Sequence, residues 1–260
     1  MYLDTLLTAE VSDSLVVAIA RVALSLRHSP AECPLYLSFL SDALAAEPPP
    51  FSSKDYAAVY EEASADARWM AISLMTNAER EGDGATRLWS LSACSSDTRI
   101  REQLKAHAVD ESRHALLYLA LLDLAFPGSV DQDFRRELQQ LSPHYSMTME
   151  VFAVPGSPYA KEPTIDDFIQ MNIAEIRTTI HHLMQRRALL GHSPPAHQTK
   201  MQRILDALLR DELNHVAYTA VIIDELAQRR PLPEAMHIFT ARVRDFNEIT
   251  NRELDQRIFD

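Results

Sequence analysis

Apolar residues recur every three or four positions along most of this 260-residue chain. This spacing is typical of amphipathic helices, and no run shows the strict alternation of a half-buried strand. Proline runs and Pro-Gly pairs separate the periodic segments. The sequence therefore predicts an all-α fold, with helices at residues 2–28, 34–46, 52 or 53 to 92, 95 or 96 to 126, 131–141, 164–191, 196–229 and 231–258.

Four of the predicted helices are long enough to form a bundle. We expect a single domain over residues 1–260, with N-terminal helices in 1–50, a four-helix bundle in 52–229 and a C-terminal outer helix in 231–260. Residues 142–163 contain four prolines and are predicted to form an irregular connection that could cover a cavity.

Composition narrows the functional classes. Apolar residues make up 47% of the chain and charged residues 24%, which are ordinary values for a globular protein. Only five glycines are present, which argues against a glycine-rich phosphate loop. The net charge of −12 argues against nucleic acid as the main partner, because nucleic-acid binding requires a basic face.

The cysteines and the N-terminal residues give an expectation for the cellular compartment. Cys33 and Cys94 lie far apart without a Cys-x-x-Cys motif, which fits a reducing compartment and excludes a rubredoxin-type iron centre. Residues 1–26 have neither a basic start nor a run of 18 apolar residues. We therefore expect a cytoplasmic protein with no membrane partner.

The motif Asp-Glu-x-x-His occurs twice, at residues 110–114 and 211–215. Residues three apart share one face of a helix, so each motif can direct a carboxylate and an imidazole inward. Roughly one Glu-x-x-His is expected by chance in such a chain, but two copies preceded by Asp are expected in about one chain in several hundred. A third copy, Glu234 and His237, lacks the Asp and follows two prolines, and we discount it.

Two further glutamates lie on the apolar faces of long helices. Glu81 lies on the inward stripe of its helix, whereas Glu79 is turned away from it. Glu175 has the corresponding place in the helix that begins near residue 164. A buried carboxylate needs a partner: either a metal ion or, for Glu81, an arginine such as Arg113.

Glycines flank Glu81, at positions 82 and 84. Glycine weakens a helix, so this pair predicts a close approach of another segment or a local distortion.

The four long helices thus supply Glu, Glu-x-x-His, Glu and Glu-x-x-His. The candidate metal ligands and catalytic residues are Glu81, Glu111, His114, Glu175, Glu212 and His215. The separations 111 − 81 = 30 and 212 − 175 = 37 suit helices that return to one level at 1.5 Å per residue. Four carboxylates balance most of the charge of two divalent ions, and each histidine adds a neutral nitrogen ligand.

Several neighbouring residues are candidates for supporting roles. Asp110 and Asp211 could accept the N–H of the opposite ligand histidine and fix its tautomer. Tyr118 is either a hydrogen-bond donor or redox tyrosine near the site, or a packing residue. His107 and His182 lie on ligand faces, as core histidines or as extra ligands, and 212 − 182 = 30 repeats the first spacing.

The ligand pattern of residues 81–215 resembles the ferritin-like non-haem di-iron carboxylate proteins. DESRH at 110–114 is similar to the motif of bacterial multicomponent monooxygenase hydroxylases, and DELNH at 211–215 is a looser copy with Asn214 where Arg is common. In length and layout the chain looks more like p-aminobenzoate N-oxygenases. Those enzymes carry an extra histidine four residues before the second motif's Glu, where this chain has Leu208.

This resemblance implies two iron ions, or a manganese–iron pair, that activate O2. It implies that Glu111 and Glu212 bridge or semi-bridge the metals, while the other four ligands are terminal. The expected function is a di-iron oxygenase or oxidase that hydroxylates or N-oxygenates a small organic substrate, in biosynthetic metabolism. An external reductase or reductant would supply electrons, and a homodimer is compatible with the outer helices.

Two alternatives remain at this point. One is a ferritin-like ferroxidase that handles iron without an organic substrate. The other is a metal-free helical bundle that acts as an interaction protein, with its Glu, His and Arg side chains in buried polar networks.

Overall fold

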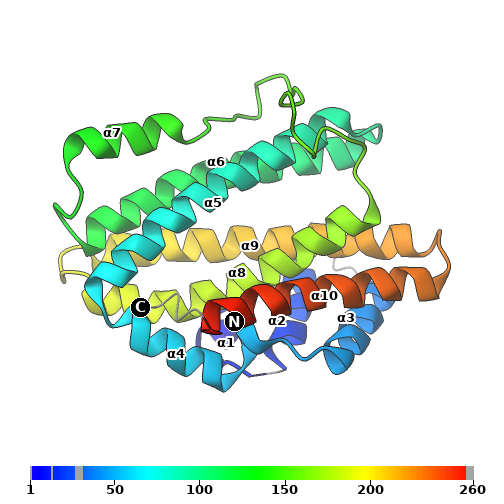
Figure 1. The fold of residues 1–260 in the computed structure, drawn as a ribbon, viewed down its shortest axis with the longest axis horizontal. Coiled ribbons are helices and arrows are strands. Elements are labelled where there is room, and N and C mark those ends of the chain that lie inside the picture. Colours follow the sequence, from blue (N-terminus) through cyan, green and yellow to red (C-terminus); the bar gives the residue numbers. More distant parts are fainter. Residues whose placement is uncertain (1, 13, 27–31, 256–260) are drawn as a thin grey trace. The chain divides into compact units, whose positions relative to one another are not determined.

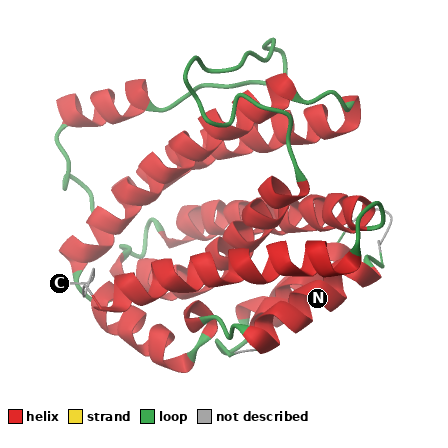
Figure 2. Cartoon of the chain, turned by 45° about the vertical axis from the view of Figure 1, so that its right-hand side comes forward, coloured by secondary structure: helices red, strands yellow, loops and turns green. Residues whose placement is uncertain are grey.

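A computed structural model describes residues 2–12, 14–26 and 32–255. Regular structure in these ranges is entirely helical (Figures 1 and 2), which confirms the all-α prediction. No helix in the described ranges is long and apolar enough to cross a membrane. The elements are α1 Tyr2–Leu7, α2 Leu15–Ser25, α3 Pro34–Ala46, the 3-10 helix η1 Pro50–Ser52, α4 Lys54–Ser64, α5 Ala67–Cys94, α6 Thr98–Ala125, α7 Gln132–Leu141, α8 Ile165–His192, α9 Gln198–Ala227 and α10 Leu232–Asp255.

The chain forms two compact units. Unit 1 comprises Met1–Ala65, Thr164–Ala188 and Ala207–Asp260, and unit 2 comprises Asp66–Pro163 and Leu189–Asp206. Helices α5, α6 and α7 therefore belong to unit 2, whereas most of α8 and α9 belongs to unit 1. The single domain and the outer position of the C-terminal helix stay predictions.

Unit 2 is built on the α5–α6 pair, two long helices joined by residues 95–97. Asp97 ends this turn and caps α6, because its carboxylate accepts the N–H groups of Arg99 and Ile100 at 2.8 and 3.1 Å. The two helices pack along each other and run in opposite directions (Figure 1). The predicted inward stripe of α6 is buried throughout: Leu104, His107, Glu111, His114, Tyr118 and Leu122.

The connection at residues 142–163 contains no helix, which confirms that it is irregular. Several contacts attach it to α5, two of which lie near the C-terminal end of that helix. The ring of Tyr145 stacks on Trp89 with centroids 4.3 Å apart, and Val154 N–H donates to Ser90 Oγ at 3.2 Å. These contacts hold the connection against the helix, while its expected role as a cover stays a prediction.

Unit 1 is held together by a buried polar network among α3, α8 and α9. Tyr36 O–H donates to Asn172 Oδ1 at 2.8 Å, and its backbone N–H donates to Asp224 Oδ1 at 3.0 Å. Burial raises the pKa of Tyr36 well above its ordinary value, so the phenol stays protonated and remains a donor. The network fixes the position of α3 on the α8–α9 pair.

A second network in unit 1 joins α4, α8 and α10. Tyr56 O–H lies 3.0 Å from His181 Nε2 and 3.4 Å from Glu253 Oε2, and Arg177 pairs with Glu253. Tyr56 and Tyr60 both stack on the His181 ring. Ser53 caps α4 by accepting the N–H of residue 56 at 3.1 Å.

Two helices predicted as continuous are interrupted. The first, at residues 2–28, is divided into α1 and α2, and its predicted end lies outside the described residues. Hydroxyl side chains occupy the break: Thr8 bonds to the Thr5 carbonyl, and Ser12 bonds to Ser14. Such short polar side chains offer the backbone local alternatives to helical bonding.

The second interruption divides the predicted helix at residues 52–92 into α4 and α5. Asp66 adopts an extended conformation and its carboxylate accepts the N–H of Trp69 at 2.7 Å, so it begins a new helix. The remaining predictions differ less: α6 to α9 begin and end within about three residues of the predicted bounds, an ordinary variation at helix ends. The predicted end of the last helix, at residue 258, lies outside the described residues.

The glycines beside Glu81 mark a close approach and no distortion. Helix α5 runs without interruption through residues 82–84. A Cβ added at Gly82 would lie 3.2 Å from Pro143 Cδ, whereas open space surrounds Gly84. The missing side chain at Gly82 therefore lets the connection approach α5.

Candidate metal centre

Three predicted ligands come together in unit 2. Glu81 extends from α5, while Glu111 and His114 extend from one face of α6, and their ligand atoms lie within 4.8 Å of one another. Glu111 and His114 are buried, and Glu81 is half-buried. His114 Nδ1 lies 3.6 Å from Glu111 Oε1. The α5–α6 packing thus assembles two carboxylates and one imidazole, and Glu81, rather than Glu79, is the α5 member.

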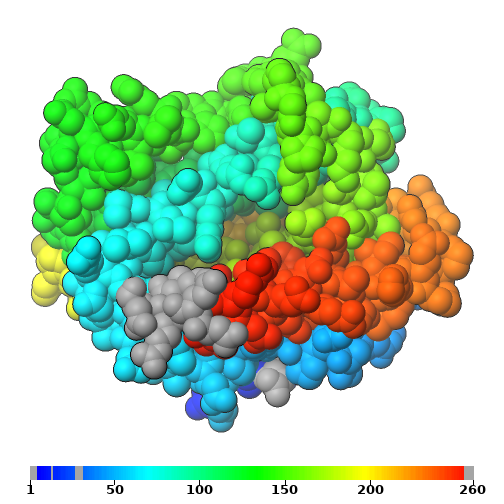
Figure 3. Space-filling model, viewed as in Figure 1, coloured from blue at the N-terminus to red at the C-terminus, as the bar shows by residue number. Residues whose placement is uncertain are grey.

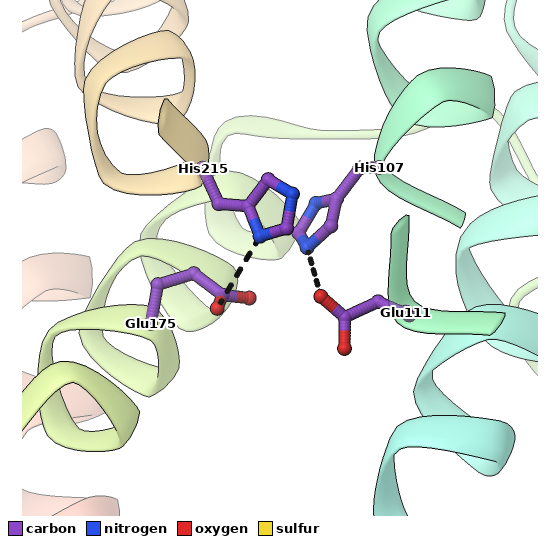
Figure 4. Close-up of side chains that lie close together, drawn as sticks. All are labelled: His107, Glu111, Glu175 and His215. Carbon is purple, nitrogen blue, oxygen red and sulfur yellow. Dashed lines mark hydrogen bonds and ion pairs between the residues drawn. The ribbon is translucent and has the colours of Figure 1, made fainter. Parts of the chain in front are cut away.

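A second histidine of α6 also reaches Glu111. His107 lies one turn earlier, is buried, and its Nε2 is 3.1 Å from Glu111 Oε1 (Figure 4). This is an ordinary hydrogen-bond distance. A carboxylate oxygen accepts, so Nε2–H donates to it and His107 orients Glu111.

Unit 1 contains a second group of the same composition, on α8 and α9. His215 Nδ1 lies 3.9 Å from Glu175 Oε2 on α8 (Figure 4). The same nitrogen lies 3.5 Å from Glu212 Oε2 on its own helix. Glu212 and His215 are buried, and the side chain of Glu175 is 13% exposed. His215 therefore lies beside both carboxylates of the second set.

His182 belongs to the same group. It is buried on α8, and its Nε2 lies 3.4 Å from Glu212 Oε1. Glu175 and His182 are seven residues apart, two turns of one helix face, so α8 supplies both. His182 was expected either to supplement or to replace Glu175, and both residues lie beside the α9 motif.

The residues predicted to support the ligands differ in burial and in hydrogen-bond partners. Asp110 Oδ1 accepts a hydrogen bond from Arg113 Nη2 at 2.7 Å, and the Arg113 side chain is 51% exposed. Asp211 is half-buried on α9. Tyr118 is buried on α6, one turn beyond His114. Contact of either aspartate with an opposite histidine stays a prediction.

One residue that joins α8 to α9 beside His215 was not predicted from the sequence. Asn172 is buried, and its Nδ2 donates to Val216 O at 3.0 Å and to Thr219 Oγ1 at 2.9 Å. Thr219 Oγ1 in turn lies 2.6 Å from the carbonyl of His215, within hydrogen-bond distance. The available signal was a polar residue three positions before Glu175, on the same apolar face of the predicted helix.

The spacing within each group suits a metal ion. Metal–ligand bonds of about 2.0–2.2 Å hold neighbouring ligand atoms roughly 3–4 Å apart. The His–Glu distances of 3.5, 3.6 and 3.9 Å exceed the usual length of an N–H···O hydrogen bond, yet they fit ligands of one ion. Carboxylate and imidazole ligands suit iron, manganese or zinc. The group in unit 2 could therefore bind a metal ion, and in unit 1 His215 has two carboxylates within metal-ligand spacing.

Comparison of the chain with protein-family models, with curated proteins and with solved structures finds no match.

Proposed function

We propose that the chain is a non-haem di-iron oxidoreductase of the ferritin-like type, which uses O2 to hydroxylate or N-oxygenate a small organic molecule. One observation carries the proposal. The same set of one Glu and one Glu-x-x-His occurs once in each unit, on the α5–α6 pair and on the α8–α9 pair. A repeated set of this kind is the ligand pattern of di-metal carboxylate proteins.

The charges support two divalent ions. The two groups together contain four carboxylates, from Glu81, Glu111, Glu175 and Glu212, whose formal charge of 4 × (−1) balances 2 × (+2). Without metal, four carboxylates with little exposure would be costly unless they were protonated or otherwise paired. Bound iron would supply the redox chemistry that O2 requires.

Neighbouring side chains position the candidate ligands of each group. His107 holds the Glu111 carboxylate by a hydrogen bond, and Asn172 with Thr219 fixes the backbone at His215. Burial of the imidazoles limits access of water, which strengthens the electrostatic interactions within each group. The substrate is proposed to be a small organic molecule, and the electrons to come from an external reductase, on the resemblance alone.

The test is metal content together with O2 consumption. Purified protein is loaded with Fe(II) without oxygen, desalted, analysed by plasma mass spectrometry, and then exposed to O2 with a chemical reductant. We expect about two irons per chain and reductant-dependent uptake of O2. Mössbauer spectra would distinguish two coupled ions, which the di-iron proposal requires, from two independent ones.

Variants assign the metals to the groups. Glu111→Ala should remove the ion of unit 2, and His215→Ala should remove that of unit 1; both should abolish O2 uptake while helicity measured by circular dichroism remains. Less than one iron per chain in the unaltered protein would contradict the proposal and favour a metal-free helical protein. Rapid oxidation of many irons per chain without a coupled substrate would favour ferroxidase activity.

A further inference from the structure

Unit 2 contains a pocket on the side of α5 opposite Glu81. Its volume is about 680 Å³, within the size range of small-molecule sites. It is lined by α5, α6, α7 and the start of the connection that follows α7. Apolar side chains predominate, among them Ile72, Met75, Leu119, Phe134 and Leu138. The pocket therefore favours an apolar ligand.

Helix α7 forms the outer wall and is part of the surface seen in Figure 3. Its side chains at positions 134, 138 and 141 share one face and line the pocket, although Phe134 is 44% and Leu141 82% exposed. Large apolar groups that remain accessible beside a cavity are typical of ligand-binding surfaces.

Contacts with α6 hold both α7 and the segment that follows it. Arg135 of α7 pairs with Asp123 of α6. Beyond the helix, Ser112 Oγ donates to Pro143 O at 2.5 Å and accepts the N–H of Tyr145 at 3.1 Å. These contacts hold α7 and the segment after it in place while leaving space between α7 and α5. The outer wall of the pocket is consequently attached to α6 on both sides of the helix end.

The charge of the lining is negative. Glu79 and Asp83, one turn apart on α5, are exposed and line the pocket, and its described lining includes no basic side chain. Asp83 also pairs with Arg87, but that guanidinium lies over the Tyr159 ring at 5.3 Å and does not line the pocket. A carboxylate pair beside an apolar surface complements a ligand with a cationic head and an apolar body.

We propose that this pocket binds an aliphatic amine, with the alkyl chain between α5 and α7 and the ammonium group beside Glu79 and Asp83. The site is separate from the His/Glu groups and does not depend on metal. Glu81 points to the other face of α5, since residues two apart on a helix face opposite sides. Failure of the proposed oxygenase activity would therefore leave this inference untouched.

Isothermal titration calorimetry with three probes of equal chain length tests the proposal: octylamine, 1-octanol and octanoate, at neutral pH and below micelle formation. We expect octylamine to bind most tightly, octanol more weakly and octanoate least. The double substitution Glu79→Gln with Asp83→Asn should weaken octylamine binding about fivefold, while octanol binding is unchanged. The control Glu137→Gln, an exposed acid on α7 that does not line the pocket, should change neither.

A second substitution tests the location. Thr76→Trp on α5 would place an indole ring in the pocket and should weaken binding of octylamine and octanol alike, with folding checked by circular dichroism. Equal affinity for octylamine and octanoate would overturn the proposal. Octylamine binding that survives both the double substitution and Thr76→Trp would overturn it as well, because the amine would then bind elsewhere.

Discussion

Nε2 of His107 lies 3.1 Å from Oε1 of Glu111, one helical turn away on α6, and both side chains are buried. The contact has the length of a hydrogen bond, whereas His114 Nδ1 stands 3.6 Å from the same oxygen. Two histidines of α6 thus lie near the same carboxylate oxygen, but only His107 is within hydrogen-bond distance of it. His107 fits as a residue that positions Glu111, and His114 fits as a co-ligand.

His107→Ala should therefore weaken the site without removing it. The metal-free protein should lose about 1–3 kcal/mol of unfolding free energy, because Glu111 loses a buried donor. Iron affinity should fall roughly 10–100-fold, the usual effect of losing a group that orients a ligand. Urea unfolding and competitive metal titration measure the two effects. His107→Gln, which can retain a donor, should recover part of both; complete loss of metal from either variant would instead make His107 a ligand.

Glu79 and Glu81 form a matched pair on α5, because one lines the exterior pocket and the other joins Glu111 and His114. Glu81→Gln should remove about one iron per chain, since a neutral amide is a poor ligand for the metals that prefer carboxylates. Glu79→Gln should leave the iron content unchanged. Plasma mass spectrometry of both variants, loaded in parallel, makes the comparison. Equal iron content would show that Glu81 is not a ligand.

The sequence predicted the composition of the two groups because helical periodicity sets which residues share a face. On α6, the spacing of residues 107, 111 and 114 placed all three on the buried stripe, as observed. The same reasoning separated Glu81 from Glu79. Periodicity could not specify that His182 meets Glu212 while Glu175 meets His215, because contacts between helices depend on how far one slides along the other.

The break between α4 and α5 could not be predicted from the sequence. Apolar spacing continues across residues 53–92, so nothing in the pattern marks the break that the Asp66 cap produces. The exterior pocket was missed for a different reason. It depends on the position of α7, which is set by the Arg135–Asp123 pair and by Ser112, and these contacts join segments that periodicity treats separately.

Three buried tyrosines of unit 1 should make stability fall at high pH. Burial raises the pKa of Tyr36, Tyr56 and Tyr60 well above the ordinary value of 10.0; for Tyr56 the charge of Arg177 opposes the effect. The unfolded chain releases these protons near pH 10 while the folded chain retains them. Their stabilising contribution is therefore complete below pH 10 and is lost as the pH rises toward the folded-state pKa values.

Each such tyrosine should lower the unfolding free energy by about 1.4 kcal/mol per pH unit above pH 10. Urea unfolding between pH 9 and pH 11.5 measures this slope, and absorbance of tyrosinate reports ionisation separately. Tyr60→Phe should reduce this slope by the contribution of one tyrosine, about 1.4 kcal/mol per pH unit. A stability that stays constant over this range would show that these phenols ionise equally in the folded and unfolded states.

Ser112 and Ser90 hold different parts of the connection that follows α7, and their replacement should release those parts separately. Ser112 Oγ accepts the amide N–H of Tyr145, and Ser90 Oγ accepts that of Val154. Ser112→Ala should raise hydrogen exchange of the Tyr145 amide about tenfold, the equivalent of one lost hydrogen bond, and leave that of Val154 unchanged. Ser90→Ala should do the reverse. If either variant instead accelerated exchange throughout unit 2, the serine would stabilise the whole unit rather than one attachment, and the outer wall of the pocket would depend on α5–α6 packing alone.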